Sequence, residues 1–159
     1  MKKVLFVCTG NICRSPLAEY IFRNRLRSDS MWEIQSAGVF AFLGSPASEP
    51  AIKVLSERGI DARAHRSQPL TKDLVDGAHL IVVMTFGHYQ EVIRRFPQAK
   101  QKVHLQTSYS LSKSEEDIPD PIGGSVEVYR NIRERLESAI SDMIIHMIKA
   151  GDLHIREKK

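Results

Sequence analysis

Short apolar runs alternate along the chain with longer segments in which apolar residues recur every three or four positions. The short runs are typical of buried strands, and the periodic segments are typical of amphipathic helices. Because strands alternate with helices, we expect an α/β fold: a single-domain, doubly wound, parallel four-stranded sheet with a ligand at the carboxyl ends of the strands. The predicted strands are Lys3–Val7, Glu33–Ser36, Leu80–Met84 and Lys102–Leu105; the predicted helices are Pro16–Ser28, Glu49–Arg58, Thr71–Asp76, His88–Arg95 and Ser125–Ala150.

The last predicted helix has the most regular pattern. We interpret its apolar stripe as core packing rather than as a cofactor site, and Gly151 is placed to end the helix. Residues 151–159 are expected to form a frayed tail. Two segments rich in glycine, proline and serine, 38–50 and 106–124, are predicted loops whose length suggests a function. The stripe consists of Val128, Ile132, Leu136, Ile140, Met143 and Met147.

Length and composition predict one domain. The chain has 159 residues, 42% of them hydrophobic, which is enough for a single domain, 1–159, with its own core. The apolar run after the first two lysines is too short for a signal peptide or a membrane span, so we expect a cytoplasmic protein. Two cysteines five positions apart provide neither a disulfide framework nor a four-ligand zinc site. Free thiols are therefore expected, with no metal and no cofactor.

The formal net charge of +4 is spread among 19 acidic residues. Two groups of arginines stand out, and each lies on the polar side of a predicted helix, where solvated side chains are the rule. We therefore expect no nucleic-acid partner and no membrane partner. The two groups are Arg23, Arg25 and Arg27, and Arg130, Arg133 and Arg135.

The first strand runs directly into a segment suited to a phosphoryl group. Cys8 stands at the end of the strand, Gly10 opens a loop whose N–H groups can face one anion, and Arg14 can bind two of its oxygens. Ser15 and Pro16 are predicted to be the N-cap and first residue of the next helix, whose N-terminus adds partial positive charge. Every component favours an anion.

This segment resembles the signature of the low-molecular-weight protein tyrosine phosphatases, Cys-x-Gly-Asn-x-Cys-Arg-Ser, which that family combines with a late Asp-Pro. The resemblance covers essentially the whole chain. It implies the flavodoxin-like fold of phosphotyrosine protein phosphatase I and a metal-independent phosphatase that forms a phosphocysteine. It further implies a phosphorylated protein as substrate and a monomer or weak homodimer. The matching residues are Cys8-Thr9-Gly10-Asn11-Ile12-Cys13-Arg14-Ser15 and Asp120-Pro121.

The chemistry needs a nucleophile, positive charge and a proton donor. We expect Cys8 to be the nucleophile, because Arg14, the loop amides and the Ser15 hydroxyl all favour a thiolate. Asp120 is the candidate general acid, held extended by the proline that follows it. The resemblance implies that Asp120 also activates water in the second step. Asp117 is its nearest rival. The phosphate-binding residues are predicted to be Thr9, Gly10, Asn11, Ile12, Cys13 and Ser15.

Three other residues have candidate roles around this loop. Asn11 tolerates left-handed backbone angles and can brace the loop, and the resemblance pairs it with Ser15 and Ser36. Cys13 could form a reversible disulfide with Cys8 or could simply be a small packed residue, and both interpretations stay open. His65 lies in a stretch that resembles a family segment near the loop.

Specificity is where the sequence departs from the tyrosine phosphatases. The family follows Asp-Pro with one or two tyrosines that wall the substrate pocket, whereas Ile122 stands here. Phe40, with Phe42, could supply this wall or could cap the core. The glycine pair after Ile122 resembles the bacterial protein arginine phosphatase branch, which has threonine at the position of Ile12. An isoleucine cannot hydrogen-bond a guanidinium, so we predict a tyrosine phosphatase, with a protein arginine phosphatase as the alternative.

Two further functions could use the same loop. An arsenate reductase needs additional redox cysteines, and this chain has none beyond Cys13. A phosphocysteine carrier of a sugar transport system, or a plain phosphate-binding module, would need no acid at Asp120. Arg14 and Asp120 together favour a hydrolase.

Overall fold

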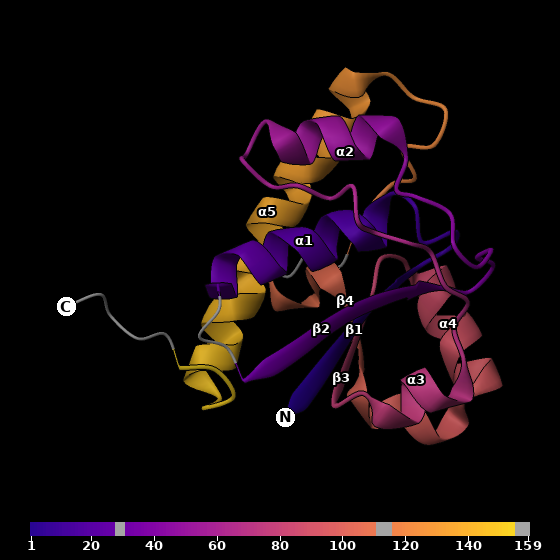
Figure 1. The fold of residues 1–159 in the computed structure, drawn as a ribbon. Helices are drawn as coiled ribbons and strands as arrows, with labels where there is room; N and C mark the ends of the chain where they lie inside the picture. Colours follow the sequence, from indigo (N-terminus) through magenta and orange to yellow (C-terminus); the bar gives the residue numbers. More distant parts are fainter. Residues whose placement is uncertain (28–30, 111–115, 155–159) are drawn as a thin grey trace.

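The computed structural model describes residues 1–27, 31–110 and 116–154 (Figure 1). Strands and helices alternate along the chain, as predicted. The elements are β1 (Lys2–Cys8), α1 (Arg14–Leu26), β2 (Trp32–Gly38), α2 (Glu49–Ser56), α3 (Lys72–Gly77), β3 (Leu80–Val83), α4 (Phe86–Arg95), the 3-10 helix η2 (Pro97–Lys102), β4 (Val103–Leu105), the 3-10 helix η3 (Gln106–Tyr109) and α5 (Val126–Lys149).

The four strands form one parallel sheet in the order β2-β1-β3-β4, which confirms the predicted doubly wound fold. β1 lies inside the sheet, with Cys8 opposite Gly38 at the carboxyl end of β2. β2 is longer than predicted because the two residues before the loop, Ala37 and Gly38, still pair with β1. All strands therefore end at the same edge of the sheet, where a doubly wound fold binds ligands.

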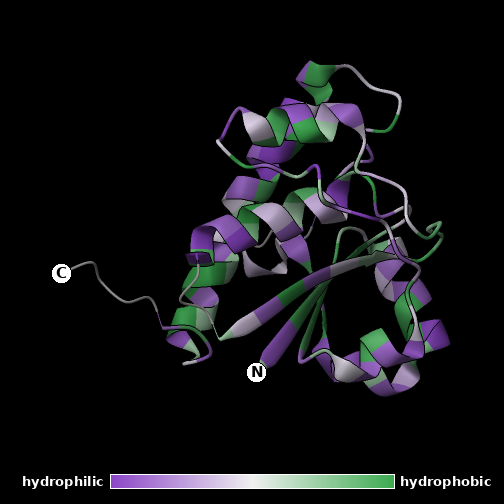
Figure 2. Ribbon diagram, in the orientation of Figure 1, coloured by the Kyte–Doolittle hydropathy of each residue, from purple (hydrophilic) through white to green (hydrophobic). Residues whose placement is uncertain are grey.

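Helices cover both faces of the sheet. Val4, Phe6 and Cys8 of β1 belong to a core cluster shared with α1, α2 and α5, whereas Leu5 and Val7 belong to a second cluster shared with α3 and α4. This alternation is the two-residue period of a strand buried on both faces. Figure 2 shows hydrophobic and hydrophilic residues mixed along the helices, as expected for helices that cover the sheet from outside. The Cys8 side chain therefore lies on the face of the sheet that α1 covers.

The helix α5 confirms its predicted stripe except at one end. Leu136, Ile140 and Met143 are fully buried, but Val128 in the first turn is 42% exposed. Arg133, expected on the solvated face, is also buried. Its guanidinium donates to the Val54 carbonyl at 2.9 Å and to the Glu57 carboxylate at 2.8 Å. The prediction for Arg133 was wrong because α2 packs over this side of α5.

Several predicted boundaries shift by one to three residues. The helix α1 begins at Arg14 rather than Pro16. Its predicted last residue, Ser28, lies outside the described residues. Thr71 is the N-cap of α3, not its first residue, and α4 begins at Phe86, two residues before the predicted start, with Thr85 as its N-cap. The 3-10 helix η2 was not predicted, and it takes Lys102 from the predicted fourth strand.

The segment after α5 is packed, at least as far as Leu153. This side chain is 4% exposed, the Trp32 indole N–H donates to the Asp152 carbonyl at 2.9 Å, and Lys2 pairs with the Asp152 carboxylate at 3.2 Å. The predicted frayed tail therefore cannot begin at residue 151, because the chain end packs against the first residues of β1 and β2. Residues 155–159 lie outside the described residues.

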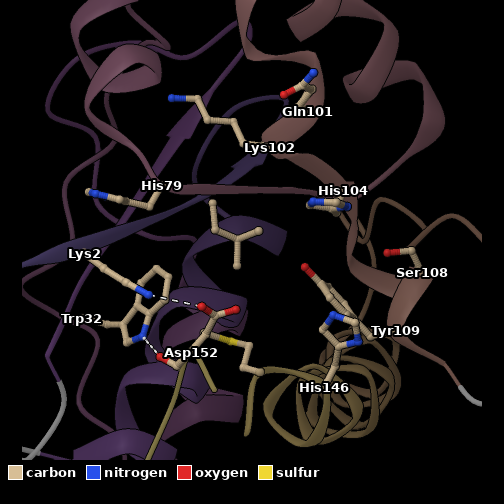
Figure 3. A pocket seen from close by; sticks show the side chains of 12 residues that line it. Lys2, Trp32, His79, Gln101, Lys102, His104, Ser108, Tyr109, His146 and Asp152 are labelled. Carbon is tan, nitrogen blue, oxygen red and sulfur yellow. Dashed lines mark hydrogen bonds and ion pairs between the residues drawn. The ribbon is translucent and has the colours of Figure 1, made fainter. Parts of the chain in front are cut away.

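Lys2, Trp32 and Asp152 line one wall of a cavity of about 610 Å³ at the amino ends of the strands (Figure 3). His104, Tyr109 and His146 form the opposite wall of this cavity. None of the predicted site residues lies there. Within the described parts of the chain, no helix is both long and apolar enough to cross a membrane.

Candidate active site

The predicted anion loop connects the carboxyl end of β1 to the N-terminus of α1. Cys8 is the last residue of β1 and is 2% exposed, and Arg14 is the first residue of α1. Among the described residues, the backbone N–H groups from Gly10 to Cys13 have no protein acceptor. Unpaired amides at a helix N-terminus are what an anion requires. The loop therefore offers an anion both donors and positive charge.

Asn11 holds the loop in its curved form. Its backbone φ is 57°, in the left-handed region that the sequence predicted for it. Its side-chain amide donates to the Ser15 hydroxyl at 2.8 Å and to the Ser36 hydroxyl at 2.9 Å, which confirms both predicted partners. Its Oδ1 atom accepts the N–H of Gln68 at 3.0 Å. All polar atoms of this buried side chain are thus satisfied.

Ser15 does not cap α1, and this prediction was wrong. The N-cap is Cys13, which makes no side-chain capping bond, and Ser15 and Pro16 lie within the first helical turn. A proline is tolerated there because the first amides of a helix have no intrahelical acceptor. The Ser15 hydroxyl instead lies 2.9 Å from the Cys8 sulfur. Because its oxygen already accepts from Asn11, its proton is free for a Cys8 thiolate.

A buried network behind the loop includes a residue that sequence reasoning missed. Glu19 of α1 is 6% exposed and accepts the Ser36 hydroxyl at 2.5 Å and the Arg23 guanidinium at 2.6 Å. His65, which the sequence had placed near the loop, donates from Nε2 to the Asn11 carbonyl at 2.7 Å. Its Nδ1 atom lies 4.0 Å from the Glu19 carboxylate. A charged residue on the buried side of a helix was the one available signal for Glu19.

Arg14 is fixed from two sides. Its Nη1 donates to the Ile118 carbonyl at 3.0 Å, and its Nη2 donates to the Thr9 hydroxyl at 3.3 Å. The carboxylate of Asp120 lies 3.7 Å from Nη2. The guanidinium is almost fully buried, so it is held in place before any anion arrives. Cys8, Arg14 and Asp120, from the two ends of the sequence, are thus brought to one edge of the sheet.

The two candidate acids have different surroundings. The Asp120 carboxylate is about half exposed, beside Arg14, whereas the Asp117 carboxylate accepts the N–H of Phe86 at 2.8 Å. Asp117 therefore stabilises the first turn of α4. The Asp120 carboxylate also accepts a backbone N–H, from Ile122 at 3.0 Å, but its Oδ2 atom lies beside Arg14. Of the two, Asp120 is therefore the carboxylate next to the phosphate-binding arginine.

Cys13 is a packed residue. Both cysteines are free, and the Cys13 sulfur lies 3.2 Å from the Tyr129 hydroxyl and 3.5 Å from the Ser48 hydroxyl. Burial raises the pKa of the Cys13 thiol, so it stays protonated at neutral pH. This confirms the packing interpretation, and the disulfide with Cys8 stays a prediction.

Several apolar side chains lie on or next to the anion loop or close to Asp120 in the chain. Phe40 and Phe42 are 72% and 83% exposed, so the interpretation that they cap the core was wrong. The N–H of Phe40 donates to the Thr9 carbonyl at 2.9 Å, which fixes this residue next to the anion loop. Ile12 is half-buried against the core, and Ile122 is 56% exposed. The wall role of Phe40 stays a prediction.

Comparison with known proteins places the chain in a family. Residues 3–152 match the family model described as low molecular weight phosphotyrosine protein phosphatase. A protein-arginine-phosphatase of Geobacillus stearothermophilus is 46% identical over 138 residues, 87% of this chain and 90% of the relative. A probable low molecular weight protein-tyrosine-phosphatase of Ralstonia nicotianae is 36% identical over 141 residues, 88% of this chain and 92% of the relative.

One solved structure of similar fold has a phosphoryl group bound covalently in its active site. It is a mutant of the YwlE arginine phosphatase with a phosphorylated active-site serine, and it is 35% identical with a TM-score of 0.87 over 92% of this chain and 96% of that one. The family model, these relatives and the shared fold agree with the anion loop described above. The chain therefore belongs to the low molecular weight phosphotyrosine protein phosphatase family.

Proposed function

We propose that this protein is a protein-tyrosine phosphatase that works through a phosphocysteine on Cys8. The observation that carries the proposal is the meeting of the Cys8 sulfur, the fixed Arg14 guanidinium and the Asp120 carboxylate around a loop of unpaired amides. In the first step the Cys8 thiolate attacks phosphorus, the bond to the leaving oxygen breaks, and Asp120 donates a proton to that oxygen. Arg14 and the loop amides stabilise the charge on the other three oxygens.

The second step regenerates the enzyme. The Asp120 carboxylate takes a proton from a water molecule as that water attacks the phosphocysteine, and the phosphorus–sulfur bond breaks to release phosphate and the Cys8 thiolate. The Ser15 hydroxyl, 2.9 Å from the sulfur, donates to the thiolate as it leaves. The proposed chemistry needs a reduced Cys8, which a reducing compartment such as the cytoplasm provides.

Ile12 supports an aromatic substrate. It follows Asn11 in the anion loop, and its side chain is only partly buried against the core, so its exposed part can contact the leaving group. An apolar contact suits a phenyl ring, whereas it leaves the donors of a guanidinium without partners at about 1–3 kcal/mol each. The exposed rings of Phe40 and Phe42 provide further apolar surface at the same edge.

The second candidate is a protein arginine phosphatase. The relative from Geobacillus stearothermophilus, at 46% identity, bears that name, and it is more similar to this chain than the tyrosine phosphatase from Ralstonia nicotianae. In that case Asp120, beside the leaving group, would bind the guanidinium as well as protonate it.

Parallel kinetics on a phosphotyrosine and a phosphoarginine peptide test the proposal. We expect a higher kcat/KM for phosphotyrosine, retention of activity in EDTA, and no activity in Cys8→Ser. Ile12→Thr should move the ratio of the two kcat/KM values toward phosphoarginine by about tenfold or more. A wild-type preference for phosphoarginine would instead establish the second candidate, and loss of activity on chelation would refute the mechanism.

A further inference from the structure

A histidine outside the predicted site connects α4 to the anion loop. His88 lies in the first turn of α4 and is 5% exposed. Its Nε2 atom lies 2.8 Å from the Thr9 hydroxyl, although the two residues are 79 positions apart. Its Nδ1 atom accepts the backbone N–H of Thr85 at 3.1 Å, and the Thr85 hydroxyl accepts the backbone N–H of His88. His88 thus completes a capping box in which glutamate or glutamine is the usual residue.

These contacts fix the position of the proton on the imidazole. Because Nδ1 accepts from the Thr85 N–H, it carries a lone pair, and the neutral ring must bear its proton on Nε2. Nε2 therefore donates to the Thr9 oxygen. Burial and the nearby charge of Arg14 lower the pKa of His88 to about 4, so the ring keeps this single tautomer at neutral pH.

The Thr9 oxygen receives a second donor, Nη2 of Arg14, at 3.3 Å. A hydroxyl oxygen has two lone pairs, and both are now used. The bond from His88 therefore fixes the rotation of the Thr9 side chain and, through it, one arm of the guanidinium. The other arm is fixed by the Ile118 carbonyl at 3.0 Å.

We propose that His88 is a positioning residue for the phosphatase reaction: through the Thr9 hydroxyl it orients the Arg14 guanidinium that binds the phosphoryl group. This inference rests on the proposed function of the loop. Correct orientation of the Arg14 guanidinium stabilises the transition state, in which the phosphoryl oxygens move, more than it stabilises the bound substrate. The loss of His88 should accordingly lower kcat more than it raises KM.

The test uses the full chain and p-nitrophenyl phosphate. We expect His88→Leu to lower kcat about tenfold or more and to weaken inhibition by inorganic phosphate, since both depend on Arg14. His88→Gln should recover most of kcat, because one amide can accept from Thr85 and donate to Thr9. As a control for stability, Thr71→Ala removes the N-cap of α3, whose hydroxyl accepts the Leu74 N–H and contacts none of the described residues of the anion loop, and should leave kcat within twofold of the wild type.

A double-mutant cycle separates positioning from general damage. Thr9→Val keeps the shape of Thr9 but removes the oxygen that both donors use, so Thr9→Val with His88→Leu should be no slower than Thr9→Val alone, within twofold. If the double variant were slower than Thr9→Val by the full factor that His88→Leu causes alone, the proposal would be overturned. A His88→Gln variant no faster than His88→Leu would also overturn it. If His88→Leu does not fold, wild-type kcat in Thr9→Val would overturn it as well.

Failure of the proposed function would be visible separately. A wild type without turnover would refute the proposed phosphatase. The role of His88 could still be tested by measuring phosphate affinity with calorimetric titration. We then expect weaker phosphate binding in His88→Leu than in the wild type, and unchanged binding in Thr71→Ala. Equal phosphate affinity in all three proteins would refute the role of His88.

Discussion

Asp117 and Asp120 are three positions apart, yet only one of them faces the anion loop. Asp120 lies beside Arg14 with about half its side chain exposed, and Asp117 holds the first amide of α4. Residue type identified both as candidates, the adjacent Pro121 favoured Asp120, and the structure places Asp120 beside Arg14. At the scale of single residues, function depends on which charged group lies beside a carboxylate.

This difference predicts opposite results for the two carboxylates. Asp120→Ala should lower kcat by about 10²–10⁴ on phenyl phosphate, whose leaving group needs a proton. Asp117→Asn keeps an acceptor for the Phe86 N–H and should retain kcat. Steady-state kinetics across pH 4–9 check both. If Asp120→Ala kept the wild-type rate, the proton donor would be another residue, with Asp117 tested next.

His88 gives the protein a specific sensitivity to acid. Its pKa is lowered from 6.5 to about 4 by burial and by Arg14, against the opposite effects of Asp117 and Asp120. Between these two pH values the unfolded chain binds a proton that the folded chain does not, so stability falls as the pH drops from about 6.5 to 4. At about 1.4 kcal/mol per unit, the loss is on the order of 3 kcal/mol.

Urea unfolding at pH 7, 5 and 4 measures this loss. His88→Gln should lose less stability than the wild type over this range, because glutamine does not titrate. The other buried groups titrate in both proteins and cancel in the comparison. The same pH dependence in both proteins would show that folding does not lower the pKa of His88.

At the scale of elements, the site is assembled where β1 and β2 end together. The backbone of Gly38, the last residue of β2, lies against the anion loop. A Cβ atom there would stand 2.3 Å from the Thr9 carbonyl oxygen and 3.0 Å from the Asn11 nitrogen. Both neighbours are backbone atoms, so the loop itself would have to move.

Gly38→Ala should therefore lower kcat/KM about a hundredfold with a smaller effect on folding, because the displaced loop holds the amides that bind phosphate. Gly77→Ala is the matched control, since a Cβ atom at Gly77 meets nothing within 4 Å. Circular dichroism and p-nitrophenyl phosphate kinetics check both variants. Normal kinetics in Gly38→Ala would contradict the close approach of β2 to the loop.

At the scale of the molecule, α5 holds the α1 and α2 side together. Its apolar stripe packs against α1, and its buried Arg133 contacts the end of α2 through the Val54 carbonyl and the Glu57 carboxylate. The 22%-exposed Glu137 on α5 itself accepts from the same guanidinium at 3.3 Å. A buried arginine with several acceptors is costly to replace, because its partners are left without a donor.

Arg133→Ala should destabilise the fold by about 2 kcal/mol, since it leaves the Val54 carbonyl unpaired and opens a gap between two helices. Arg135→Ala, which removes an exposed arginine two residues away, should change stability by less than about 0.5 kcal/mol. Urea unfolding of both variants checks the contrast. Equal stability of the two variants would contradict the structural role of Arg133.

The sequence by itself determined the order of strands and helices and the position of the anion loop. Cys8, Asn11 and Arg14 could be identified because their roles follow from residue type, spacing and the end of a buried strand, all within eight positions. The alternation of strands and helices predicted the parallel sheet, and the carboxyl ends of its strands are the edge where the loop was expected. These are local properties, and local patterns encode them.

The tertiary structure decided which distant residues support that loop. Glu19 and His88 are polar residues without a motif, and Arg133 looked like one more solvated charge. Their roles depend on contacts between segments that are far apart in the chain, such as the 79 positions between Thr9 and His88. Such contacts arise from how helices pack on the sheet, and residue spacing within one segment carries no information about them.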